Sequence, residues 1–323
     1  MPAGPVVPIV PTTPKGFQAF LRSCTITVGT WKSANIGAQR GLDAAFTVRR
    51  SLKAKEPNTC DLKIWNLSDA SRQAIAQAAQ KTNLVAAPPT GVPSVPGLPL
   101  SIIPVQIDAG YVGHTSTIFL GEMSNGTSRS AQSVTDGPDS VLELNCGDGD
   151  TALALQRINA SFQKGTAPID VVQALLAKMG VGTGNLGAVK PIINSAQGSL
   201  FQAGVVLKGN AADHLVDICA GLGLEFSVQN GAAQFLSLGE PLAGQAYKLT
   251  SSSGLIGSPT VDTAGICSFV TLMLPGIAPG VPVSIDANFV QGDFRILSVE
   301  YEGDTAGNDW YCKCEAARLG VAP

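Results

Sequence analysis

The chain has 323 residues, of which 45% are hydrophobic and 14% charged, with a formal net charge of -3 and a mean hydropathy of +0.21. A chain of this length can bury sizeable cores, and it predicts about two or three domains. No basic block is present to neutralise phosphates, so the composition argues against nucleic acid as a partner. Such a small share of charged residues indicates apolar surface that other subunits cover, which favours an assembly protein.

No stretch of the sequence predicts insertion into a membrane or a signal peptide. The apolar run 269–285 contains three prolines and is interrupted well before it reaches the length that spans a bilayer. Residues 1–16 are rich in proline and lack a basic n-region. We therefore expect an extended N-terminal arm of polyproline character and synthesis in the cytoplasm.

The seven cysteines are scattered, odd in number and mostly placed in apolar segments. This pattern predicts buried thiols rather than a disulfide framework. They are Cys24, Cys60, Cys146, Cys219, Cys267, Cys312 and Cys314.

Alternation of polar and apolar residues with a period of two dominates residues 17–146 and predicts an antiparallel β domain. An interruption at 68–100 is expected to hold a helix over 70–80 and a proline-rich surface excursion over 87–99. Strands are expected at 22–28, 44–50, 60–65, 103–111, 116–120 and 141–146.

The periodicity changes in residues 147–244, which predict a small α/β domain. Asp150 is expected to cap a helix over 151–162. An apolar stripe predicts a second helix over 169–179, which Gly180 ends.

The rest of this middle domain follows a glycine-rich link at 180–187. Asn210 is expected to cap a third helix. Asn230-Gly231, which lies between two alternating runs, is the strongest hairpin signal in the chain.

Alternation returns in residues 245–323 and predicts a second β-barrel domain of short strands. The fold class is therefore mainly β with an α+β middle: two antiparallel β-barrel domains flank a small α/β segment. We find no residue-level repeat between the outer domains, so a duplication stays open. Strands are expected at 268–274, 281–289, 294–302 and 311–316.

The sequence offers little support for nucleophilic catalysis. His114 falls in an expected turn and His214 lies early on the third expected helix, and such histidines are far more often surface or packing residues than catalytic bases. No serine lies in a G-x-S-x-G elbow, and no cysteine has an obvious histidine partner.

Two short motifs resemble metal sites only in part. Cys312 and Cys314 point to the same face of an expected strand, but a tetrahedral site needs two further ligands, so two packed thiols are expected. Asp148-Gly-Asp150 resembles the start of a calcium loop, yet Ala152 occupies the third ligand position. A turn and a helix cap explain this motif.

Two loop motifs also have structural explanations. The glycine-rich run 181–187 lacks the lysine of a P-loop and does not lead into a convincing helix, so a flexible connection is expected. Asp304 and Asp309 are expected to bind backbone groups in a tight turn.

Paired carboxylates offer the one route to an enzyme. Glu225, Glu240, Glu300 and Glu302 could in principle supply a glycosidase pair. However, Glu300 and Glu302 share one strand face, and no acid is placed opposite a base across a cleft. We therefore predict no catalytic, cofactor-binding or metal-binding residues and expect no enzyme activity.

The segment 254–310 resembles the C-terminal part of baseplate hub proteins of contractile-tailed bacteriophages. It contains GLIGSP, LMLPGIAPGVPVSI and FRILSVEYEGDTAGNDW, which resemble the entry, body and last turn of a small β-barrel in those proteins. Further similar segments, in the same order as in hub relatives, are CDLKIWNLS, SFQKGTAPIDVVQALLAKMG and KGNAADHLVDICAGLGLEFSVQNGAAQFLSLGEPL.

The resemblance implies a structural protein with two tube-like β domains per chain. Three chains would form a ring with quasi-sixfold symmetry, which joins the hexameric tail tube, or a tube-initiator protein, to the trimeric central spike. Baseplate wedge or tape-measure proteins are further expected partners. The expected location is the virion tail baseplate, after synthesis in the bacterial host cytoplasm. The alternatives are a tail-tip cell-wall hydrolase and a carbohydrate-binding β protein; the latter would usually expose more aromatic residues than this chain offers.

Overall fold

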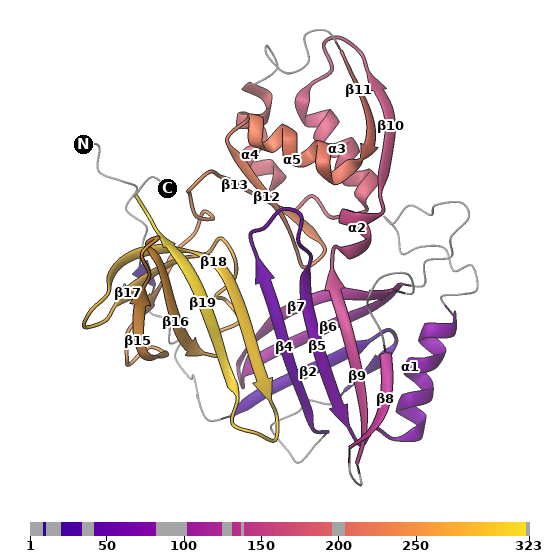
Figure 1. The fold of residues 1–323 in the computed structure, drawn as a ribbon, viewed down its shortest axis with the longest axis vertical. Coiled ribbons are helices and arrows are strands. Elements are labelled where there is room, and N and C mark those ends of the chain that lie inside the picture. The colour runs from indigo at the N-terminus through magenta and orange to yellow at the C-terminus, as the bar shows by residue number, and fades with distance from the viewer. Residues whose placement is uncertain are drawn as a thin grey trace.

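The computed structural model shows two β units side by side, with an α/β unit above them in the view of Figure 1. The expected 87–99 excursion lies outside the described residues, as does the N-terminal arm apart from β1 (Ile9–Val10), which pairs in parallel with β14. The structure describes residues 9–10, 21–33, 42–81, 102–124, 131–136, 139–195 and 204–320.

The N-terminal β unit confirms the expected alternation, because buried and exposed residues alternate along its strands. Helix α1 (Asp69–Lys81) lies on its flank (Figure 1). The strands are β2 (Arg22–Val28), β3 (Trp31–Lys32), β4 (Ala44–Ser51), β5 (Asn58–Trp65), β6 (Ile102–Tyr111), β7 (His114–Ser124), β8 (Ala131–Asp136) and β9 (Asp139–Asp148).

The C-terminal β unit has six strands. Its core-facing side chains include Ile285 and Ile296, both buried. The strands are β14 (Ala246–Leu249), β15 (Leu255–Val261), β16 (Ile266–Leu272), β17 (Pro282–Asp286), β18 (Gln291–Asp304) and β19 (Trp310–Arg318).

The two β units share one strand order. The N-terminal unit runs β4-β5-β9-β7-β6-β2, and the C-terminal unit runs β15-β16-β19-β18-β17-β14. When the two-residue β3 and the strand β8, which pairs only with β9 among the described strands, are left out, numbering the six remaining strands along the chain gives the same spatial sequence in both units. They differ at one end, where β2 pairs with β6 antiparallel and β14 pairs with β17 parallel. An internal repeat is therefore visible in the topology although the sequence does not reveal it.

One pairing fuses the two units into a continuous sheet. Along one edge of β18, residues 291–295 pair with β17 and residues 298–304 pair with β4. The other edge pairs with β19. We call the antiparallel β4·β18 pairing the seam. A single apolar core runs beneath it and includes Phe46 and Val48 from β4 and Val299 and Tyr301 from β18.

The α/β unit has its own apolar core and corrects one expectation. The helix expected over 151–162 is wrong: α2 (Asp150–Ala154) is a short turn of helix, and β10 (Arg157–Phe162) pairs antiparallel with β11 (Val205–Asn210). The alternation in RINASF places Ile158 in the core and competes with the helical pattern.

Helix α3 (Pro168–Met179) ends at Gly180, which has φ 74°, as expected. The prediction for 181–187 is wrong, because α4 (Leu186–Ser195) begins inside that run and its apolar residues join the core. Pro191 inside this helix lowers the helix propensity of the segment, so the sequence does not predict a helix here.

The last helix and the hairpin agree with the sequence. Asn210 caps α5 (Ala211–Gly221): its side chain accepts a hydrogen bond from the Ala212 amide at 2.8 Å. Strands β12 (Leu224–Gln229) and β13 (Ala232–Ser237) form the expected hairpin, in which Asn230 and Gly231 have φ of 52° and 74°.

Candidate functional site

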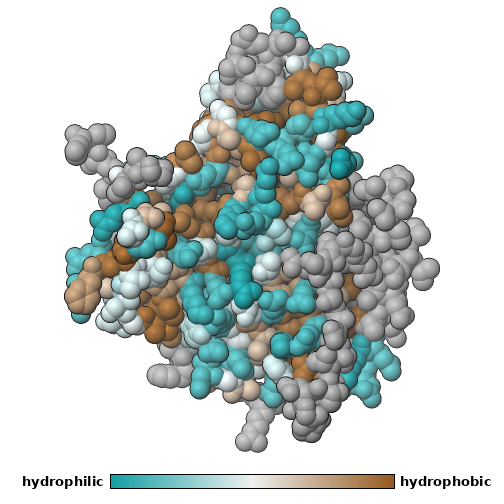
Figure 2. All heavy atoms as spheres, viewed as in Figure 1, coloured by the Kyte–Doolittle hydropathy of each residue, from teal (hydrophilic) through white to brown (hydrophobic). Residues whose placement is uncertain are grey.

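The candidate site is the polar face of the fused sheet, on the side opposite the β core. Strands β5, β4, β18 and β19 lie side by side here, and a cavity of about 900 Å³ opens over them toward β16 and β15. Figure 2 shows hydrophilic side chains gathered on this face of the molecule. The site is therefore a broad trough that crosses the seam.

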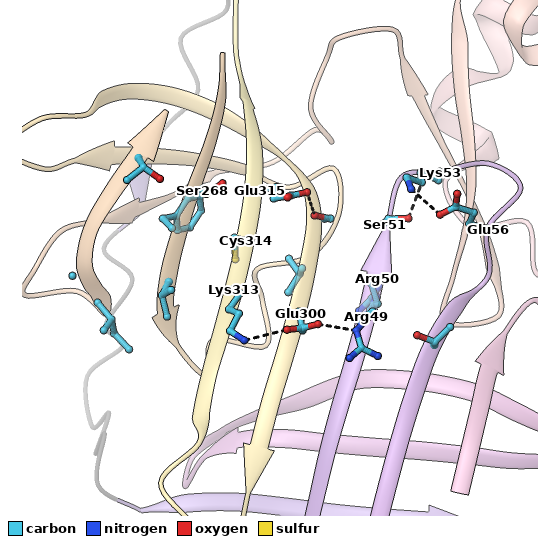
Figure 3. A pocket seen from close by; sticks show the side chains of 18 of the residues that line it. Arg49, Arg50, Ser51, Lys53, Glu56, Ser268, Glu300, Lys313, Cys314 and Glu315 are labelled. Atoms are coloured by element: carbon cyan, nitrogen blue, oxygen red, sulfur yellow. Dashed lines mark hydrogen bonds and ion pairs between the residues drawn. The ribbon is translucent and has the colours of Figure 1, made fainter. Parts of the chain in front are cut away.

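A ladder of alternating charges crosses the seam (Figure 3). Arg49 of β4 binds Asp61 of β5 at 2.9 Å and Glu300 of β18 at 2.7 Å. Lys313 of β19 binds Glu300 at 3.3 Å and also Glu302. Each of these cations binds two carboxylates and both bind Glu300, so the ladder holds two cations and three carboxylates and its charges nearly balance. Cross-strand pairs of this kind favour one register of β4 against β18.

Lys313 and Glu302 each stabilise the charged form of the other. Hydrogen bonding to Glu302 raises the pKa of Lys313. Burial opposes ionisation of Glu302, but hydrogen bonds from Lys313 and Tyr311 outweigh it and lower the pKa of this carboxyl. The same Glu302 contact raises the pKa of Tyr311 to about 12. These shifts move the pKa values of Lys313, Glu302 and Tyr311 away from neutral pH, whereas a general acid or base works best with a pKa near the operating pH.

The turn at residues 304–310, at the end of the segment that resembles hub proteins, binds the N-terminal β unit. Asp304 organises the turn by accepting hydrogen bonds from the amides of Ala306 and Gly307 at 2.9 and 2.7 Å, as expected. Arg22 of β2 donates to the Asp304 and Gly307 carbonyls at 2.8 and 2.7 Å. The buried Trp310 indole donates to the Gly110 carbonyl at 3.0 Å. The turn therefore fixes one β unit against the other.

A buried polar network joins the α/β unit to the N-terminal β unit. Asp148 accepts from Asn58 Nδ2 at 3.0 Å and from the amides of Asn230 and Gly231 at 2.6 and 2.8 Å. Burial raises the pKa of Asp148, although these donors oppose the shift. Asp148 of the Asp148-Gly-Asp150 motif therefore binds the turn of the β12–β13 hairpin.

A second contact joins the α/β unit to the C-terminal β unit. Arg295 of β18 donates to Glu225 of β12 at 2.7 and 3.2 Å and to the Glu240 carbonyl at 3.3 Å. Arg50 of β4, which pairs with Val299 in the seam, is also buried and donates to Gln229 Oε1 at 3.1 and 3.2 Å. The α/β unit is therefore fixed to both β units.

The structure separates the remaining candidate residues. His114 begins β7, and His214 lies on α5 with its ring 3.2 Å from the Lys208 carbonyl. Asp309 stabilises the turn through its backbone carbonyl, which accepts a hydrogen bond from the Asp304 amide at 2.7 Å. Nothing in the described part of the chain brings the two histidines together with a nucleophile.

All seven cysteines are buried and none forms a disulfide, which confirms the expected buried thiols. Burial raises the pKa of Cys312 to about 12, and that of Cys314 also rises. A search of the described residues finds no group of His, Cys, Asp and Glu that could hold a metal ion. None of the described helices is long and apolar enough to cross a membrane.

Three of the four candidate carboxylates are paired with cations. Glu300 and Glu302 share one strand face and bind the same lysine. Glu225 is paired with Arg295. The sequence analysis identified these residues but missed Arg49 and Lys313. The alternation of buried and exposed residues along β4 and β19 places both on the exposed face, and this pattern could have identified them.

No protein-family model matches the sequence, and no curated protein matches it. Solved structures do. The 43 kDa tail protein of prophage MuSo2 from Shewanella oneidensis is 11% identical, with a TM-score of 0.54 over 92% of this chain and 98% of its own. The tail protein from Neisseria meningitidis MC58 is 9% identical, with a TM-score of 0.58 over 93% and 97%.

The chain has the fold of a phage tail protein. A third structure with this fold is an Escherichia coli component of the type VI secretion system, which exhibits structural similarity to the T4 bacteriophage tail proteins gp27 and gp5. It is 11% identical, with a TM-score of 0.52 over 92% of this chain and 79% of its own. These neighbours confirm, at the level of fold, the resemblance to hub proteins and the mainly β fold class.

Proposed function

We propose that the protein is a structural baseplate hub of a contractile phage tail. Three copies form a ring with quasi-sixfold symmetry that joins the hexameric tail tube, or a tube initiator, to the trimeric central spike. The observation that carries this proposal is the repeated strand order, with the two repeats fused edge to edge at the seam. The tail-protein fold of the neighbours supports it.

The symmetry argument is geometric. A trimer contacts a sixfold partner evenly only when each chain presents two equivalent faces. Two β units with the same strand order, fixed in one sheet, provide two such faces. In this proposal residues 17–146 and 245–323 are the tube-like domains, residues 147–244 the domain between them and residues 1–16 an arm.

The polar trough fits the wall of a channel. Its ladder carries nearly balanced charge, because Arg49 and Lys313 bind the carboxylates of Asp61, Glu300 and Glu302, and the opposite face of the same strands lies on the apolar core. A polar wall stays wet, whereas apolar edges are available for contacts between subunits. In this proposal the trough lines the ring and is not a substrate cleft.

The proposal makes the protein a virion component rather than an enzyme. Its partners are other copies of itself, the tube, the spike and neighbouring wedge or tape-measure proteins, and it acts in the tail baseplate after synthesis in the host cytoplasm. The hydrolase alternative requires an acid opposite a base across the trough. Of the carboxylates that line it, Glu300 binds Arg49 and Lys313, Glu56 binds Lys53, and Glu315 accepts a hydrogen bond from the Ser298 hydroxyl at 2.8 Å.

The test is the mass and shape of the purified chain. Light scattering at micromolar concentration is expected to give three times the 33.1 kDa chain mass. Averaged electron micrographs are expected to show a ring with six similar lobes around a channel. A monomer at all concentrations, together with assembled tails that lack a trimer of this chain, would refute the proposal. Sugar-binding and wall-digestion assays test the two alternatives.

A further inference from the structure

Phe289, at the tip of the β17–β18 hairpin, is the most exposed large hydrophobic side chain in the described part of the chain, at 86%. The hairpin itself is well fixed, because the Ala287 amide donates to the Val290 carbonyl at 3.1 Å and Val290 is buried. Asn288 and Phe289 therefore form a two-residue turn. Such turns favour Gly, Asn and Asp, so neither turn chemistry nor packing within the chain accounts for an aromatic residue at this tip.

The β6–β7 hairpin is the counterpart of the β17–β18 hairpin in the N-terminal β unit. Each of them joins the fourth and fifth of the six strands in the common order. The β6–β7 turn also has two residues, Val112 and Gly113, because Tyr111 pairs with His114. Val112 is 38% exposed, far less than Phe289. The two tips are therefore equivalent in topology, and each presents an apolar side chain, but they differ in how much of it is covered.

The end of the β6–β7 hairpin contacts the other β unit of the same chain. The Gly110 carbonyl accepts a hydrogen bond at 3.0 Å from the indole of Trp310, the first residue of β19. Tyr111 is buried in the core that the two β units share. Arg22, which pairs with Tyr111, binds the turn that precedes β19. The hairpin between the fourth and fifth strands of one unit therefore lies against the start of the sixth strand of the next unit.

The proposed ring contains this type of contact twice for each chain. The N-terminal unit meets the C-terminal unit within a chain, and the C-terminal unit meets the N-terminal unit of the next chain. Quasi-sixfold symmetry requires the two contacts to be alike. The sixth strand of the N-terminal unit is β9, which follows β8 through a hairpin. The surface that corresponds to the start of β19 is therefore the start of β9 on the next chain.

We propose that the tip of the β17–β18 hairpin docks on the β8–β9 hairpin of a second copy of this chain, and that Phe289 is buried in this contact. The partner is a second copy because the chain already contains the equivalent contact, between the β6–β7 hairpin and Trp310. Buried aromatic side chains supply much of the binding energy of protein interfaces. This inference rests on the proposed trimeric hub and assigns a side chain to the contact between its chains.

The experiment compares Phe289→Ser with Val206→Ser in the full-length chain. Val206 on β11 is 70% exposed but lies in the α/β unit, so it is the matched control for the loss of an exposed apolar side chain. F289S is expected to raise the concentration at which half of the chain is trimeric by at least about tenfold, because the trimer no longer buries the aromatic side chain. V206S is expected to assemble like the wild type. Circular dichroism spectra and melting temperatures show whether both variants fold.

A second measurement locates the contact without weakening it. The photoreactive analogue benzoylphenylalanine replaces Phe289, and irradiation of the trimer is expected to link two copies covalently. Mass spectrometry of the linked peptides is expected to place the link on the β8–β9 hairpin, within residues 131–148. The same analogue at Val206 is expected to give no link between copies.

The outcomes separate the two proposals. If the wild type trimerises but F289S does so at the same concentrations, or if the probe at 289 never links to a second copy, the Phe289 contact is wrong although the trimeric hub stands. If the wild type does not trimerise in solution or in tails, both are wrong. Weaker assembly of F289S than of V206S, together with a link to β8–β9, establishes the contact.

Discussion

The buried Arg295–Glu225 pair provides the sharpest test of how the α/β unit is held. The Arg295 side chain is 8% exposed, and replacing it with Met keeps most of its volume but removes the guanidinium. Glu225, 23% exposed, then retains a single long contact, from the Gly239 amide at 3.5 Å. The variant therefore leaves a carboxylate largely desolvated and without its cation.

The magnitude follows from this geometry. Removing one member of a buried ion pair costs about 3–5 kcal/mol. Because Glu225 keeps some solvent contact, R295M is expected to lower the free energy of unfolding by about 3 kcal/mol, at the lower end of that range. The double variant R295M/E225L replaces both charges with apolar groups and is expected to recover most of the loss, because no unpaired charge remains.

Urea unfolding followed by tryptophan fluorescence measures the wild type, R295M, the single variant E225L and the double variant, and the two-state character of each transition is checked with a second probe. Lys53→Met is the control, since its ion pair with Glu56 at 2.9 Å is exposed to solvent and is expected to contribute little to stability. A loss in R295M no larger than in K53M, or a double variant as unstable as R295M, would contradict the assignment of Arg295 as a buried fixing contact.

Three further outcomes follow from backbone, charge and thiol burial. Gly184→Ala is expected to lower stability by at least about 2 kcal/mol, because its Cβ would lie 1.7 Å from the Ala233 carbonyl oxygen, whereas Gly187→Ala, with open space, is expected to be neutral or stabilising. The pKa of Asp148 is raised by burial, so its contribution to stability is present at low pH and lost as pH rises through the folded-state value. The free energy of unfolding of the wild type minus that of Asp148→Asn is therefore expected to increase as pH falls from neutral. A value that decreases as pH falls would contradict this. Finally, a thiol reagent is expected to leave the native chain unlabelled and to modify seven cysteines after denaturation, with the same melting temperature in reducing and oxidising buffer; rapid labelling of the native chain would refute thiol burial.

The strands were predictable because each has one buried and one exposed face. The sequence prediction 22–28 coincides with β2, and the predicted segments at 44–50 and 103–111 each lie within one residue of an observed strand at both ends. Helix prediction failed where local signals conflicted: RINASF follows a helix start yet alternates with a period of two, and Pro191 lies inside α4. Such conflicts are decided by tertiary packing, which a local pattern does not encode.

The candidate site was less accessible from sequence because its contacts are long-range. Arg49 and Glu300 are 251 residues apart, and Arg22 binds a turn more than 280 residues away. Each looks like an ordinary exposed charge until the seam brings the strands together. The hub-like turn was predicted as a tight turn, and Asp304 confirms this, but its role as a clasp depends on the other β unit.

The α/β unit links the stability of the chain to the geometry of the proposed ring. A heterologous contact closes into a ring only when each chain sets the same rotation between its two joining edges; otherwise it extends into an open filament. The rotation here depends on the angle between the β units at the seam, and a seam of paired strands can still twist. Gln229 binds Arg50 beside the seam, while Glu225, on the same strand β12, binds Arg295 on the other unit. A single strand thus holds both β units, so we infer that it fixes their angle and that loosening it by R295M would broaden the distribution of ring sizes as well as lower stability.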